Sequence, residues 1–154
     1  MPDVAKRETY FLHGEEETLS FGNELAGRLS KGLVFLHGDL GAGKTTLTRG
    51  ILRGLGYEGR VRSPTYTLME KYELEGGSVC HFDLYRMADP EELEFLGARD
   101  ELVPENLCLI EWPKRGKGWL GHQNLDICLT FSRQPTENIE KVGRQIDLYW
   151  QTSI

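Results

Sequence analysis

The chain has 154 residues, the length of one typical domain, so we expect a single domain over residues 1–154. Hydrophobic residues make up 39% of the sequence and charged residues 27%, a balance that excludes a disordered chain. The formal net charge of −6 argues against binding nucleic acid through the overall field of the chain and leaves open only a local basic patch.

The start of the chain and the cysteines predict a cytoplasmic protein without a membrane segment. No apolar run approaches the ~20 residues of a transmembrane helix, and residues 1–8 lack the apolar core of a signal peptide. Cys80, Cys108 and Cys128 each stand alone in an apolar stretch. An odd number of cysteines without C-x-x-C spacing argues against a disulfide framework or a zinc site, so we expect small buried thiols in a reducing compartment.

Helices and strands alternate in the first part of the chain, and strands dominate the last part. In chain order, hydrophobic periodicity and turn signals predict a strand, a helix, a strand and a helix over residues 8–12, 15–30, 32–37 and 44–55. They then predict a helix that begins at Asp89, and strands over residues 65–74, 78–85, 107–112, 125–131 and 144–150. This order predicts an α/β protein with three layers and a mixed central sheet.

Residues 38–45, which read GDLGAGKT, match the phosphate-binding pattern G-x-x-x-x-G-K-[ST]. They lie between an apolar strand and an amphipathic helix, an order in which the N–H groups of a glycine turn and of a helix N-terminus point at one anion. We therefore expect a P-loop NTPase-like fold. The residues expected to bind the nucleotide are Asp39, Leu40, Gly41, Ala42, Gly43, Lys44, Thr45 and Thr46.

Two residues of this loop have specific expected roles. Lys44 would reach the β- and γ-phosphates of a nucleotide, and Thr45 would place its hydroxyl on Mg²⁺. The sequence has no N-K-x-D motif, which reads guanine in GTPases of the Ras type. ATP with Mg²⁺ is therefore the expected ligand.

Two acids directly follow apolar strand residues and are candidates for the metal-binding and catalytic carboxylates. Glu111 ends the segment LCLIE, and Asp83 ends the segment VCHFD. The carboxyl end of a strand is where α/β sheets bind ligands, and phosphoryl transfer needs a carboxylate near Mg²⁺. The alternative for each acid is a solvated strand end. His81 shares the strand face of Asp83, and we expect it to be packed or hydrogen-bonded rather than catalytic.

The segment SPT at residues 63–65 follows the phosphate-loop helix, where nucleotide hydrolases place switch loops. Pro64 keeps the preceding residue extended and stiffens the approach to the site. We expect Thr65 to sense the γ-phosphate and Mg²⁺ and count it among the catalytic candidates. The alternative is an ordinary turn into the next strand.

Together these segments resemble one family, the bacterial TsaE proteins, formerly called YjeE. The resemblance covers residues 15–119 and rests on GDLGAGKTT, SPTYTL, HFDLYR, DPEELEFLG and LIEWP, in that order and spacing. It implies a small P-loop ATPase required for N6-threonylcarbamoyladenosine at position 37 of tRNA. It also implies that Lys44 and Thr45 contact phosphate and Mg²⁺, that Glu111 is the metal carboxylate, and that Asp83 is the second acidic position.

The resemblance implies protein partners as well. Family members act with the TsaB–TsaD pair and with TsaC, which makes the threonylcarbamoyl adenylate. The net charge of −6 makes contact with tRNA through that complex a better expectation than direct binding. In an isolated small domain the site would be open to water, so we expect Mg²⁺-dependent hydrolysis that a docked partner accelerates.

Two other function classes compete with a partner-stimulated ATPase. A small-molecule or nucleotide kinase is disfavoured because few residues remain for an acceptor pocket and no Arg-rich lid is visible. A binding module, in which ATP only fixes a shape, is disfavoured by the two well-placed carboxylates. Transfer of phosphate to water rather than to an added acceptor would separate the first class from the second.

Overall fold

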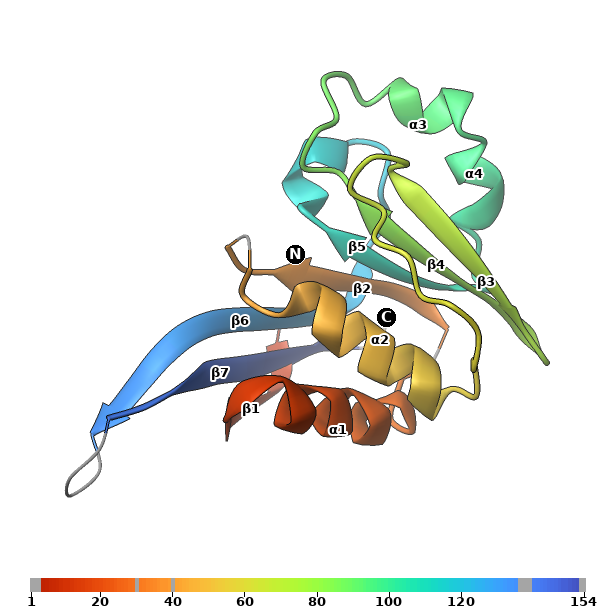
Figure 1. Cartoon of the computed structure of the whole chain (residues 1–154). Coiled ribbons are helices and arrows are strands. Elements are labelled where there is room, and N and C mark those ends of the chain that lie inside the picture. Colours follow the sequence, from red (N-terminus) through yellow and green to blue (C-terminus); the bar gives the residue numbers. More distant parts are fainter. Residues whose placement is uncertain (1–3, 30, 40, 136–139, 153–154) are drawn as a thin grey trace.

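The computed structural model describes residues 4–29, 31–39, 41–135 and 140–152. Its centre is a seven-stranded mixed sheet with the order β1-β7-β6-β2-β5-β4-β3 (Figure 1). The strands are β1 (Val4–Leu12), β2 (Gly32–His37), β3 (Met69–Leu74), β4 (Gly77–Asp83), β5 (Leu107–Glu111), β6 (Gln123–Pro135) and β7 (Glu140–Gln151).

The middle of the sheet is parallel and its two sides are antiparallel. β2 pairs in parallel with both β5 and β6, and β4 pairs in parallel with β5. The antiparallel pairs are β1 with β7, β6 with β7, and β3 with β4. The carboxyl ends of β2, β4 and β5 therefore meet at one edge of the sheet, where α/β proteins bind ligands.

One face of the sheet is covered by α1 (Gly14–Ala26) and α2 (Lys44–Gly54), which lie against each other (Figure 1). The two helices approach closely because they meet at glycines. A Cβ on Gly50 would lie 2.4 Å from the carbonyl oxygen of Leu19. Below the helices, α2 buries its apolar stripe of Leu47, Ile51 and Leu52 against the strands. This packing fixes where α2 begins, and hence where the phosphate loop lies.

The opposite face of β4 and β5 is covered by α3 (Glu92–Phe95), α4 (Ala98–Glu101) and the 3₁₀ turn η1 (Pro113–Gly116). The helix expected from Asp89 begins later, at Glu92, and a turn with two reciprocal side-chain hydrogen bonds precedes it. The side chain of Asp89 accepts the N–H of Glu91, and the side chain of Glu92 accepts the N–H of Asp89. The three layers and the mixed sheet confirm the predicted α/β P-loop NTPase-like fold.

Most predicted elements are present, although several of their boundaries differ. The strand expected over residues 65–74 begins only at Met69, because the preceding residues form a turn. The N–H of Leu68 donates to the carbonyl oxygen of Pro64 at 2.8 Å, and Leu68 has a φ of 67°. The predicted helix over residues 15–30 ends earlier, at Ala26. No helix within the described ranges is long and apolar enough to span a membrane.

The three cysteines are free thiols, as expected. Cys80 and Cys108 are buried and face each other in register across β4 and β5, whereas Cys128 is partly exposed. The contact with Cys108 and burial raise the pKa of the Cys80 thiol. These thiols therefore behave as small core residues rather than as nucleophiles.

Candidate active site

The predicted site residues line one hollow of about 300 Å³ at the carboxyl edge of the parallel strands. The wall is made by the phosphate loop, the start of α2, the turn before β3, and the ends of β4 and β5. Its lining residues are Gly41, Gly43, Lys44, Thr45, Thr46, Thr65, Asp83, Glu111 and Arg144. Of the other predicted loop residues, Ala42 is buried beneath the loop, Asp39 is exposed beside it, and Leu40 lies outside the described residues.

The phosphate loop has the backbone shape that anion binding requires. Gly41 has a φ of 81° and Gly43 a φ of 106°, angles that other L-residues rarely adopt. Gly43 directly precedes α2, and no side chain of the described chain caps this helix. The first N–H groups of α2 are thus uncapped at the hollow, where the helix dipole also favours negative charge.

Lys44 is only 5% exposed and lies between three groups. Its Nζ donates to the carbonyl oxygen of Gly38 at 2.6 Å and lies 3.7 Å from Oε1 of Glu111. The same ammonium sits 4.4 Å from the centre of the Trp112 ring, a cation–π distance. These contacts hold the lysine ammonium in the hollow, where its charge favours an anionic ligand.

Glu111 is a buried carboxylate with a histidine partner. It is 4% exposed, and Nε2 of the fully buried His81 lies 2.6 Å from its Oε2. An imidazole nitrogen facing a carboxylate donates its hydrogen to it, so His81 is a hydrogen-bonded residue, as expected. Nδ1 of His81 has no hydrogen-bond partner among the described residues. Burial rules out the solvated strand end as an account of Glu111.

Asp83 lies beside Glu111 and is tied to the turn before β3. The two acids are register partners on β4 and β5, and Asp83 is 6% exposed. Its Oδ1 accepts the N–H of Tyr85 at 3.0 Å, and its Oδ2 accepts the hydroxyl of Thr65 at 3.3 Å. The hydroxyl of Ser63 lies 2.8 Å from that of Thr65. The predicted sensor and the predicted acid thus form one hydrogen-bonded unit.

The two carboxylates and one hydroxyl offer the oxygen ligands that Mg²⁺ prefers. Asp83, Glu111 and Thr45 line the same hollow. No group of three or more His, Cys, Asp and Glu side chains in the described ranges is arranged to hold a metal by itself. Mg²⁺ commonly binds one or two carboxylates together with nucleotide phosphates, so this donor set fits a nucleotide-bound ion.

Trp112 continues the site beyond Glu111. It has a φ of 57°, a conformation uncommon for a bulky residue, and its ring lies 4.9 Å from that of Tyr85. This turn of the backbone directs the indole onto Lys44 rather than along the strand. A neighbouring hollow of about 400 Å³ on the other side of the loop is lined by Trp112, Pro113, Asp39 and other residues.

Arg144 is a site residue that the sequence analysis missed. It belongs to β7, and its Nε donates to the carbonyl oxygen of Ala42 at 2.8 Å across 102 positions of sequence. No motif surrounds it, and in the sequence it marks only the start of a predicted strand. Only the pairing of β7 with β6 brings it to the phosphate loop.

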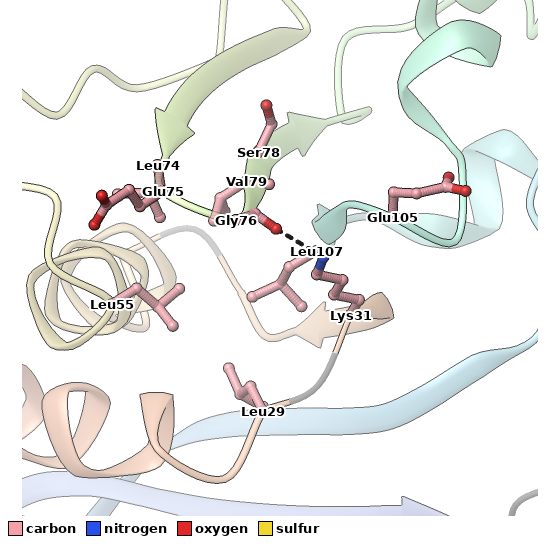
Figure 2. Close-up of a pocket in the computed structure, with 11 residues that line it drawn as sticks. Leu29, Lys31, Leu55, Leu74, Glu75, Gly76, Ser78, Val79, Glu105 and Leu107 are labelled. Atoms are coloured by element: carbon pink, nitrogen blue, oxygen red, sulfur yellow. Dashed lines mark hydrogen bonds between the residues drawn. The ribbon is translucent and has the colours of Figure 1, made fainter.

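Another hollow lies at the other edge of the sheet, at the amino ends of the parallel strands (Figure 2). It has a volume of about 200 Å³ and an apolar floor that includes Leu29, Leu55 and Leu74. Lys31 at its rim donates to the carbonyl oxygen of Gly76 at 2.7 Å. Its lining includes two acids, Glu75 and the exposed Glu105, but no phosphate loop or helix N-terminus, so the candidate active site is the hollow at the phosphate loop.

Comparison with known proteins shows which family this chain is similar to. The model of the family described as "Threonylcarbamoyl adenosine biosynthesis protein TsaE" matches residues 12–141 of this chain. A Haemophilus influenzae protein named "tRNA threonylcarbamoyladenosine biosynthesis protein TsaE" is 46% identical over 142 residues, covering 88% of this chain and 89% of that protein. A Bacillus subtilis protein of the same name is 38% identical, covering 74% of this chain and 72% of its own length.

A solved structure has the same fold. The crystal structure of Bacillus subtilis YdiB superimposes with a TM-score of 0.65 at 26% sequence identity. The match covers 94% of this chain and 86% of that one. The similarity therefore includes the antiparallel strands that lie outside the recognised motifs.

Proposed function

The chain belongs to the TsaE family, and we propose that it is a Mg²⁺-dependent ATPase that serves the formation of N6-threonylcarbamoyladenosine at position 37 of tRNA. The observation that carries the ATPase proposal is the pair of buried carboxylates, Asp83 and Glu111, side by side at the strand ends that face the phosphate loop. A module that only bound a nucleotide would need the loop and the lysine but not two desolvated acids.

The residues of the hollow divide the work of hydrolysis between them. The N–H groups of the loop and the ammonium of Lys44 bind and orient the phosphates. Thr45, Asp83 and Glu111 would hold Mg²⁺, which supplies charge neutralisation on the transferring phosphate. His81 holds the carboxylate of Glu111 in place, and Thr65 links the turn before β3 to Asp83.

We also propose that hydrolysis takes place in the cytoplasm on a complex with TsaB and TsaD, with tRNA reached only through that complex. The turn before β3, which contributes Thr65 to the hollow, also carries Tyr66, which is 81% exposed. Arg86 lies over the Tyr66 ring at 4.6 Å. A partner that covered this side would exclude water from the transferring phosphate and strengthen the electrostatics of the site.

Phosphate release tests the proposal directly. We expect slow, Mg²⁺-dependent release from ATP by the chain alone, faster release with TsaB–TsaD, and no acceleration by tRNA alone. Full activity of the isolated chain, or stimulation by tRNA without the proteins, would contradict the partner role. Phosphate transfer to an added acceptor in place of water would identify a kinase instead.

A further inference from the structure

Arg144 lies at the phosphate loop, and no acid within the described part of the chain pairs with it. Its register partner on β6 is Phe131, and the guanidinium lies 5.5 Å from the centre of that ring. Two residues further along β7, Ile146 is fully buried in the core beneath the helices. Because alternate residues of a strand share a face, this burial directs Arg144 to the side of the sheet that carries α2 and the loop.

The loop is shaped around this side chain. A Cβ on Gly43 would lie 2.7 Å from Nε of Arg144 and 2.9 Å from its Cδ. Glycine at position 43 thus allows the left-handed backbone of the loop. It also leaves room for the side chain of Arg144, which comes from the far end of the chain. The hydrogen bond from Nε to Ala42 holds the guanidinium against the rim of the hollow.

The acids that line the hollow do not form an ion pair with Arg144 within the described residues. Lys44 lies 3.7 Å from a carboxylate oxygen of Glu111, whereas Arg144 forms no ion pair with any acid of the described residues. Of the five N–H donors of its guanidinium, only the one on Nε is used in a hydrogen bond within that part of the chain. A cation with free donors, lining a hollow beside a phosphate loop, fits an anionic ligand.

We propose that Arg144 binds a phosphate group of the nucleotide, so that β7 contributes a charged residue to the site. This inference rests on the proposed nucleotide-binding function. Through Nε the arginine also supports the loop. A variant without the positive charge distinguishes this supporting role from phosphate binding. A supporting role needs only a donor to Ala42, whereas phosphate binding needs the positive charge as well.

Calorimetric titration with Mg²⁺–ADP and Mg²⁺–ATP separates these roles. Arg144→Gln keeps an amide donor without the charge, and Arg144→Lys keeps the charge without the planar fork. We expect Arg144→Gln to weaken binding about tenfold or more, the scale of a hydrogen bond to a charged group, and Arg144→Lys to weaken it less. The affinity of the unmodified chain should also fall more steeply with added salt than that of Arg144→Gln.

Arg53→Gln is the matched control because it removes the same charge at the far end of α2. Arg53 also donates to backbone carbonyls, those of Tyr57 and Gly59. The Arg53→Gln variant should bind Mg²⁺–ADP and Mg²⁺–ATP with the same affinity as the unmodified chain. The inference would be overturned if Arg144→Gln bound nucleotide as tightly as the unmodified chain. It would also be overturned if both Arg144 variants lost the same affinity and the salt dependence of binding did not change. Either result would leave the proposed nucleotide site in place. If the unmodified chain bound neither nucleotide, the proposed function itself would fail.

Discussion

Nε2 of His81 lies 2.6 Å from Oε2 of Glu111, and both side chains are buried at the end of neighbouring parallel strands. The bond leaves Oε1 of Glu111 toward Lys44 and the hollow. His81 thus sets which edge of the carboxylate faces the phosphate loop. In the proposed hydrolysis His81 would act through Glu111, as a positioning residue.

His81→Leu should lower the turnover of ATP with little change in nucleotide affinity. It removes the donor and leaves Oε2 of the buried Glu111 without its hydrogen bond, which costs about 1–3 kcal/mol of stability. His81→Gln keeps an N–H donor and should retain more turnover than His81→Leu. Steady-state phosphate release, calorimetric titration and urea unfolding measure the three quantities. Equal turnover in both variants would show that the hydrogen bond has no positioning role.

Glu111→Gln should reduce Mg²⁺-dependent hydrolysis by ~10²-fold or more, the scale of losing a preorganised electrostatic partner. The substitution is close to isosteric and should preserve the fold, because the amide can still accept from His81. Phosphate release over a range of Mg²⁺ concentrations measures the effect. Glu105→Gln, an exposed acid before β5, is the control and should hydrolyse ATP like the unmodified chain.

Thr65→Val and Asp83→Asn should have effects that do not add. Thr65→Val removes the hydroxyl of the 3.3 Å hydrogen bond between the turn and the end of β4, and Asp83→Asn removes the charge of its acceptor. The double variant should therefore lose less turnover than the two single losses combined. Asp83→Asn alone should lower turnover more than it lowers nucleotide affinity, because in the proposed site this acid would hold Mg²⁺ during the reaction rather than bind the nucleotide itself. Fully additive losses in phosphate release would mean that the two residues act independently.

Lys44→Ala should abolish nucleotide binding in the micromolar to millimolar range, because the phosphates lose a buried point charge. The control is Lys31→Ala, which removes a lysine that also donates to a backbone carbonyl, at the opposite edge of the sheet. Fluorescence titration with a labelled nucleotide compares the two. Unchanged affinity in Lys44→Ala would exclude the loop as the nucleotide site.

The stability of the chain should fall in acid through Glu8 on β1. The hydrogen bond from Arg28, with others from Tyr10 and Trp150, lowers the pKa of Glu8 from 4.5 to about 2. A carboxyl whose pKa is lower in the folded state stabilises it above about pH 4.5, and this stabilisation is lost as the pH falls toward 2.

Urea unfolding from pH 6 down to about pH 2 measures this loss, because the unfolded and folded pKa values are 4.5 and about 2. Glu8→Gln should be less stable than the unmodified chain at the upper pH and should show a smaller fall in its urea midpoint. The exposed Glu58→Gln serves as the control and should behave as the unmodified chain does. If the urea midpoint of Glu8→Gln fell with pH by the same amount as that of the unmodified chain, Glu8 would be excluded as the source of the acid destabilisation.

Much of the site was predictable because its signals are local. The loop at residues 38–45 and the acids Asp83 and Glu111 each follow a short apolar strand, and the physics of helix N-termini and strand ends needs only such neighbours. The pairing of His81 with Glu111 was partly predictable. Strand alternation placed His81 on the correct face, but the register of β4 against β5 chose its partner.

The phosphate loop, the α/β fold class and the candidate carboxylates follow from the sequence, since each depends on contacts among residues close in the chain. The tertiary structure alone decided which distant groups complete the site. Arg144 reaches Ala42 only because β7 pairs with β6 beside β2, and Trp112 covers Lys44 only because its backbone turns to a positive φ. Such contacts depend on sheet order and on the packing of α2, which are set by the free energy of the whole core rather than by any local pattern.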